Sequence, residues 1–73
     1  MAKTSMADRL RMVLALRNVN MSQLARDIGV TQAAVSSMCI GRSNPRADTL
    51  ILICRRLNVS ADYLLGLVDY YDI

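Results

Sequence analysis

One short segment in the middle of the chain carries polar side chains that can hydrogen-bond to flat ligands. Gln32 has an amide that donates and accepts at once, which matches the edge of an adenine base. A small apolar side chain can pack on a thymine methyl group, and serine hydroxyls can bond to any base. If the segment is helical, these side chains share the face opposite its apolar positions. We therefore expect the following residues to read base edges: Gln32, Ala33, Ser36 and Ser37.

Groups that can bind phosphate flank this segment on both sides. Arg26 precedes it, and Arg42 and Arg46 lie in the loop that follows it. Thr31 can cap the segment as a helix, and the free backbone amides at a helix start attract anions. Since the reading face itself carries no charge, affinity must come from Thr31, Arg26, Arg42 and Arg46, which we expect to contact phosphates.

Simpler roles remain open for several of these side chains. Gln32 could be a solvated residue of a first helical turn, and Arg42 and Arg46 could be solvated loop charges. Arg55 and Arg56 lie where basic residues complement a helix dipole, so we do not expect them to contact a ligand. The elements around these residues favour the binding roles.

Two short helices and a tight turn must position the polar face. The first, residues 21–28, repeats apolar residues on one side at Leu24, Ala25 and Ile28. Gly29 then takes the left-handed backbone conformation that ends the helix. Val30 turns inward before the second helix, residues 32–39, begins. This order is the helix-turn-helix pattern, whose second helix enters the DNA major groove.

Three more helices complete an all-α chain. Ser5 and Asp8 have the spacing of a capping box and predict a helix to about Arg17. Further helices are expected at about 47–57 and 61–65. The expected core comprises Met6, Leu10, Val13, Leu14, Val19, Leu24, Ala25, Ile28, Val30, Val35, Met38, Cys39, Leu50, Ile53, Cys54, Leu57 and Tyr63, and the expected outward charges are Arg9, Arg11 and Arg17.

The composition excludes several functional classes. The chain has no His or Glu and no phosphate-cradling glycine loop, so we expect no enzyme. Its two cysteines, Cys39 and Cys54, fall inside helical patterns, so we expect no metal and no cofactor, and no small-molecule site is evident. No apolar run is longer than that of residues 50–54, which is far too short for a membrane span, and no signal peptide is visible. These features predict a cytoplasmic, nucleoid-associated protein.

The charge distribution fits a polyanion ligand. The net charge is +3, but residues 1–60 carry nine basic side chains against three acidic ones. Residues 61–73 carry three acidic side chains and no basic ones. A basic body with an acidic end is consistent with binding to DNA through one face.

Most of the chain resembles a known family. The stretches SQLARDIGVTQAAVSSM and DTLILICRRLNVSADYLLG, separated by a Gly-Arg loop, resemble the lambda-repressor-like (Cro-type, XRE) DNA-binding domains from about Arg9 to Gly66. The resemblance implies a compact five-helix domain over residues 1–66. Residues 67–73 would then form an apolar C-terminal tail that serves dimerisation or packing.

Three positions depart from the family pattern. Many members begin the second helix with a Gln that bonds a phosphate and supports the recognition helix, where this chain has Met21. Some relatives join the first and third helices by a buried Arg–Glu pair, replaced here by Leu14 and Cys39, which we expect to touch. A small or polar residue near a phosphate is replaced by Ile40.

The sequence therefore predicts a sequence-specific DNA-binding transcriptional regulator, a bacterial or phage repressor that acts as a homodimer on double-stranded DNA. The alternative is a protein-interaction module on the same fold, such as an antitoxin-like partner. Both uses need an apolar surface, for which the sequence offers Ile51, Leu52, Tyr70, Tyr71 and Ile73.

Overall fold

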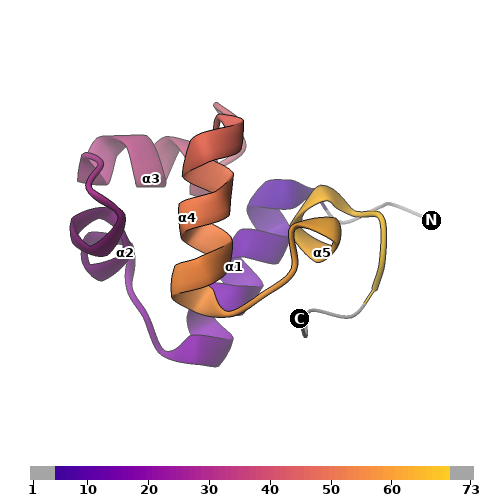
Figure 1. The fold of residues 1–73 in the computed structure, drawn as a ribbon. Coiled ribbons are helices and arrows are strands. Elements are labelled where there is room, and N and C mark those ends of the chain that lie inside the picture. Colours follow the sequence, from indigo (N-terminus) through magenta and orange to yellow (C-terminus); the bar gives the residue numbers. More distant parts are fainter. Residues whose placement is uncertain (1–4, 70–73) are drawn as a thin grey trace.

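The computed structural model describes residues 5–69 as five helices packed around one core (Figure 1). No strand occurs in this part of the chain. In Figure 1, α4 stands in front of α1, with α2 and α3 on one side of it and α5 on the other. The expected all-α, five-helix fold is confirmed. The helices are α1 (Met6–Arg17), α2 (Met21–Ile28), α3 (Gln32–Cys39), α4 (Ala47–Leu57) and α5 (Ala61–Leu65).

Local capping groups set the helix boundaries. Ser5 and Asp8 form the expected capping box of α1, and Asn20 and Gln23 form another at α2. The hydrogen bonds that Asp8 makes with the Ser5 backbone and side chain lower the pKa of this carboxyl. Asn18 ends α1 and Asn58 ends α4, both in the left-handed conformation that Asn tolerates better than most residues.

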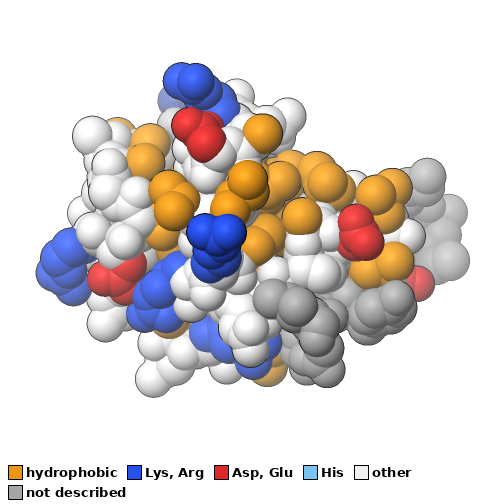
Figure 2. Space-filling view, in the orientation of Figure 1, with side chains coloured by type: hydrophobic (Ala, Val, Ile, Leu, Met, Phe, Trp, Pro, Cys, Tyr) orange, Lys and Arg blue, Asp and Glu red, His pale blue; other side chains and the backbone are white. Residues whose placement is uncertain are grey.

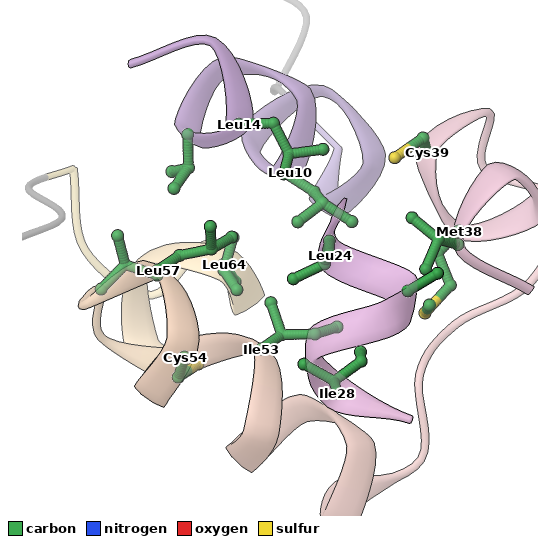
Figure 3. Packing of buried hydrophobic residues seen from close by; sticks show 14 of the residues in the cluster. Leu10, Leu14, Leu24, Ile28, Met38, Cys39, Ile53, Cys54, Leu57 and Leu64 are labelled. Atoms are coloured by element: carbon green, nitrogen blue, oxygen red, sulfur yellow. The ribbon is translucent and has the colours of Figure 1, made fainter. Parts of the chain in front are cut away.

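Aliphatic side chains from all five helices meet in one buried cluster (Figure 3). Leu24, Val35 and Ile53 are fully buried, and Tyr63 is buried as expected. Val19 and Val30 pack against the cluster from the two turns. The cluster consists of Leu10, Val13, Leu14, Leu24, Ala25, Ile28, Val35, Met38, Cys39, Ile53, Cys54, Leu57, Val59, Tyr63 and Leu64.

Besides Val19 and Val30, two more expected core residues lie at the edge of this cluster. Met6 and Leu50 are half-buried and pack against it from outside. Met6 is the first residue of α1, where few elements surround it. Leu14 and Cys39 both belong to the cluster, as their apolar character predicts, while direct contact between them stays a prediction.

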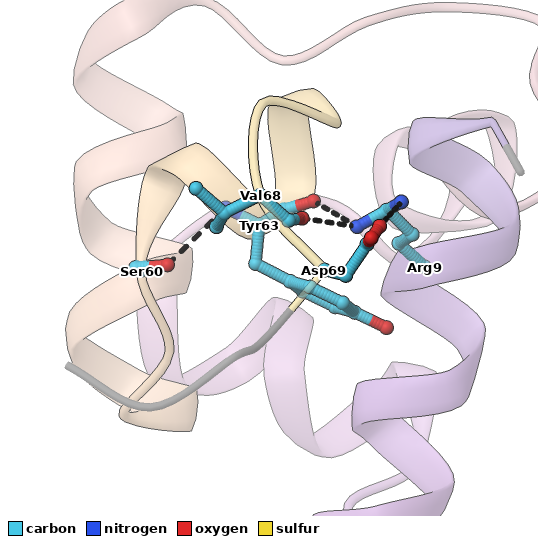
Figure 4. A network of polar contacts seen from close by, with 5 residues as sticks. All are labelled: Arg9, Ser60, Tyr63, Val68 and Asp69. Carbon is cyan, nitrogen blue, oxygen red and sulfur yellow. Dashed lines mark hydrogen bonds and ion pairs between the residues drawn. The ribbon is translucent and has the colours of Figure 1, made fainter.

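The expectation that Arg9 points outward is wrong, because the structure buries this residue. It is only 9% exposed, and its side chain extends from α1 to the end of the described chain. Its guanidinium donates to the carbonyl oxygens of Tyr63 at 3.0 Å and Val68 at 2.8 Å (Figure 4). Asp69 accepts at 3.4 Å, and the Tyr63 ring stacks 4.6 Å from the guanidinium carbon. The hydrogen bonds to these carbonyls offset the free-energy cost of burying the charged guanidinium.

Arg17 and Arg11 also reach across to other elements. Arg17 is half-buried, and it donates to the carbonyls of Leu57 at 2.8 Å and Asn58 at 3.0 Å. Arg11 is exposed, as expected, but it bonds to the Cys39 carbonyl. A cation near the last carbonyls of a helix stabilises that helix end, so both arginines cap a neighbouring helix.

Candidate nucleic-acid interface

The turn between α2 and α3 holds the two helices in a fixed relation. Gly29 adopts φ +78°, and its N–H donates to the Ala25 carbonyl at 2.9 Å. The Val30 N–H donates to the same carbonyl at 3.0 Å. Ala25 is buried, and its small side chain leaves room for α3. Val35 and Met38 face the core, so the opposite side of α3 faces outward.

The outward side of α3 is most exposed at the start of the helix. The Thr31 hydroxyl accepts from the Ala34 N–H at 3.1 Å, which confirms its role as the helix cap. Gln32 and Ala33 are exposed, whereas Ser36 and Ser37 one turn later are half-buried. The structure therefore gathers the four expected base-reading residues on one helix, with the first two the more accessible.

Ser22, which sequence reasoning did not single out, touches this face. Its hydroxyl donates to the Gln32 side-chain oxygen at 2.8 Å. The two residues are ten positions apart, on the first turn of α2 and the first turn of α3. Met21, the first residue of α2, has no hydroxyl or amide, and its neighbour Ser22 makes the hydrogen bond to α3. A sequence search for hydrogen-bonding residues in the first turn of α2 could have found it.

The expected phosphate-binding arginines are exposed and lie on α2 and in the loop that follows α3. Arg42 follows α3, where its backbone N–H donates to the Ser37 carbonyl at 2.9 Å and holds the loop against the helix. Arg46 lies 3.8 Å from Asp48, but both side chains are largely exposed and the pair is weak. Within residues 5–69, neither Arg26 nor Arg42 is paired with a carboxylate.

An apolar area lies across the face shown in Figure 2, over α4 and α5, while the surface over α3 is mostly uncharged. Ile51 and Leu52 are 50% and 43% exposed on α4, as a partner surface requires. Leu65 and Leu67 are also exposed near the end of the described chain. The other expected partner residues, Tyr70, Tyr71 and Ile73, lie outside the described residues.

Three further properties of the described residues concern metal ligands, free thiols and membrane-spanning helices. They contain no group of three His, Cys, Asp or Glu side chains able to hold a metal ion. Cys39 and Cys54 are free thiols, and burial raises the pKa of both. In the same residues, no helix has the length and apolar character needed to cross a bilayer.

Comparison with known sequences points to DNA-binding regulators. A family model described as helix-turn-helix matches residues 10–64. The chain is 34% identical over 64 residues to an uncharacterized HTH-type transcriptional regulator, YobD of Bacillus subtilis. This match covers 88% of the present chain and 57% of YobD. The chain is also 37% identical over 60 residues to the HTH-type regulator for conjugative element SXT of Vibrio cholerae, covering 27% of it and 82% of this chain. The chain thus spans about half or less of the curated relatives' length.

Comparison with solved structures gives a similar result. The crystal structure of the P22 c2 repressor in complex with a synthetic operator superposes with a TM-score of 0.82 at 25% identity. The match covers 86% of this chain and 96% of that one. The matches to the family model, the regulator sequences and the repressor structure each include α2, the turn and α3.

Proposed function

The chain belongs to the helix-turn-helix family of lambda-repressor-like DNA-binding domains, and we propose that it acts as a sequence-specific transcriptional repressor. One observation carries this proposal. The exposed side of α3 is uncharged and rich in hydrogen-bonding groups, and exposed arginines lie on the elements next to it. A protein built this way can present α3 to base edges while its flanks bind the backbone.

Base recognition is assigned to the outward side of α3. The Gln32 amide can bond adenine through its oxygen and nitrogen together, and Ala33 can contact a thymine methyl group. Ser36 and Ser37 are half-buried, so their hydroxyls would reach base edges only where α3 lies closest to the DNA. No arginine on α3 is available to bond guanine, so discrimination between sites should be modest.

Phosphate binding is assigned to Arg26, Arg42, Arg46 and the backbone at Thr31. Each arginine is exposed, so it can replace counterions along the DNA without burying its charge. If two protomers bind together, their six arginines give about six phosphate contacts. Affinity should then fall about a thousandfold between 50 and 200 mM salt.

We further assign the active form as a homodimer bound to two half-sites about 34 Å apart. A single copy, whose α3 carries no charge, would bind DNA weakly, so two linked copies are needed to occupy an operator. The exposed Ile51 and Leu52 on α4 supply apolar area for a second copy, with Tyr70, Tyr71 and Ile73 as further candidates. Repression would be steric, through occupation of an operator, in the cytoplasm at the nucleoid and without enzymatic activity.

The test is a random-site DNA selection with the protein and two variants. The wild type should select a two-fold symmetric motif. Gln32→Ala should relax one position in each half-site, and a good bidentate pair is worth about 1–3 kcal/mol of discrimination there. Arg42→Ala should weaken all sites alike and reduce the salt dependence. Arg55→Ala, on an exposed part of α4 away from the reading face, is the control.

A different result would redirect the assignment. Salt-sensitive binding without any selected motif would contradict sequence-specific regulation, and the apolar surface of α4 would then favour a protein partner. A motif without symmetry, bound by a single copy in sedimentation experiments, would contradict the homodimer.

A further inference from the structure

An apolar hollow of about 130 Å³ lies between α1 and α5. Its lining consists of Met12, Val13 and Leu16 from α1 and Tyr63 from α5, and none of these residues belongs to α2 or α3. Val13 and Tyr63 are buried beneath it, whereas Met12 and Leu16 are 56% and 51% exposed at its edge. Single exposed aliphatic residues are common on protein surfaces, but two of them that flank an apolar hollow form a surface for another apolar group.

The described chain ends beside this hollow. The Val68 carbonyl accepts from the Arg9 guanidinium at 2.8 Å, and the Asp69 carboxylate lies 3.4 Å from the same group (Figure 4). The guanidinium carbon lies 4.6 Å from the centre of the Tyr63 ring, which lines the hollow. Met12 follows Arg9 by about one turn on the same side of α1, because residues three apart on a helix are neighbours. The next residues of the chain therefore start about one helical turn from the hollow.

The segment that follows is long enough to cross the hollow. Residues 70–73 lie outside the described part of the chain, and an extended segment of four residues spans about 13 Å. Leu16, at the edge of the hollow that is farther from Arg9, lies seven residues after it, which corresponds to about 10 Å along α1. A segment that starts after Asp69 can therefore reach Leu16 if it is extended.

The side chains of this segment alternate as an extended segment in the hollow requires. Successive side chains of an extended chain point to opposite sides, so Tyr71 and Ile73 share one side and Tyr70 and Asp72 the other. The first pair has no charge, whereas the second includes a carboxylate that needs water. The side with Tyr71 and Ile73 therefore matches the hollow. A tyrosine ring also makes a favourable contact with a methionine sulfur such as that of Met12.

We propose that residues 70–73 pack along the hollow of their own chain, with Tyr71 against Met12 and Ile73 against Leu16. The occupant is the chain's own segment, because a segment tethered by so few residues has an effective concentration in the millimolar range, which a second copy reaches only in concentrated solution. The inference goes beyond the proposed function, since it does not depend on DNA recognition by α3.

This packing narrows the surface that is available to a second copy. Tyr71 and Ile73 are then occupied within one chain, whereas Ile51 and Leu52 on α4 are exposed and do not line the hollow. The homodimer proposed above would therefore depend on α4.

NMR of the full chain with isotope-labelled methionine methyl groups tests the packing directly. The Met12 methyl group should show nuclear Overhauser cross-peaks to the ring protons of Tyr71. Tyr71→Ala should remove them and shift the Met12 methyl resonance, because the ring current is lost. Tyr70→Ala is the matched control and should leave the Met12 resonance in place. A sample that mixes labelled and unlabelled chains shows whether the cross-peaks arise within one chain.

Urea denaturation measures how much the packing stabilises the protein. Tyr71→Ala should lower the folding equilibrium constant about two- to tenfold, the factor expected for one methionine–aromatic contact. In a Met12→Ala background the same substitution should cost less, because the shared contact is already gone. In a Leu52→Ala background it should cost the full factor, since Leu52 lies on α4 outside the hollow. Met12 is exposed on a helix, where alanine is well tolerated, so these variants should fold.

Two results would overturn the proposal. Cross-peaks that arise only between differently labelled chains would make a second copy the occupant of the hollow. A Met12 methyl group without any cross-peak to Tyr71 would show that the segment does not cover it. Either result leaves the proposed recognition of DNA by α3 unchanged, and failure of the DNA selection leaves the packing of residues 70–73 unchanged.

Discussion

At the scale of single residues, Arg9 is the clearest case of a charged side chain built into a core. Its guanidinium binds two main-chain carbonyls and the Tyr63 ring, which connects α1 to α5 and to residues 68–69. The Asp69 side chain is fully exposed, so its ion pair with Arg9 adds little. The carbonyl bonds therefore supply most of the stabilisation.

Arg9→Met should lower the free energy of unfolding by about 2–3 kcal/mol. The variant fills much of the same space, but it removes the Arg9 donor from the Val68 carbonyl and from the Tyr63 carbonyl, which keeps only the Gly66 N–H at 3.0 Å. Urea denaturation followed by circular dichroism measures the loss. Asp69→Ala should change the stability by less than about 0.5 kcal/mol. An equal loss in both variants would show that the ion pair, rather than the carbonyl bonds, holds the two elements together.

At the scale of elements, the junction of α2 and α3 depends on one backbone conformation. Gly29 has φ +78°, and no atom lies within 4 Å of the position a Cβ would take. A side chain there would meet no neighbour, so any cost of substitution comes from the backbone angle alone. This makes Gly29 a clean test of how much the turn depends on glycine.

Gly29→Ala should destabilise the protein by about 1–2 kcal/mol, the cost of a left-handed conformation for an ordinary residue. Gly29→Asn should cost less, because Asn adopts this conformation at Asn18 and Asn58 in the same chain. Both are measured by urea denaturation. If alanine and asparagine cost the same, the loss would have another origin than the backbone angle.

At the scale of the whole molecule, one aliphatic cluster supports all five helices. The chain contains no Trp or Phe, so Leu, Ile and Val fill most of this volume. The cysteines belong to the cluster from two different helices, Cys39 at the end of α3 and Cys54 on α4. Their thiols therefore report on the integrity of the core from both sides.

Thiol reactivity should follow global unfolding. Burial hides the sulfur atoms of Cys39 and Cys54 and raises their pKa, which reduces the reactive thiolate at neutral pH. A chromogenic disulfide reagent should react about four-thousandfold more slowly in buffer than in urea, the factor that corresponds to an opening free energy of about 5 kcal/mol. Ser43→Cys provides an exposed thiol as the fast control. Rapid native reaction of Cys39 or Cys54 would show that the core opens locally.

The sequence by itself determined the helices and the turn. Capping residues and glycines act on their nearest neighbours, so Ser5, Asn20, Thr31 and Gly29 specify boundaries that can be read directly from the chain. The apolar spacing likewise gave most of the core and the outward side of α3, because helical periodicity places residues on faces without knowledge of the partner.

Only the tertiary structure decided which distant groups meet. Arg9 looked like a surface charge because nothing near it in the sequence reveals the Tyr63 and Val68 carbonyls, 54 and 59 residues away. Arg11 reaches the end of α3, and Ser22 reaches Gln32, for the same reason. A polar side chain is satisfied by whatever group the packed helices bring to it, and that depends on how α1, α2 and α3 cross.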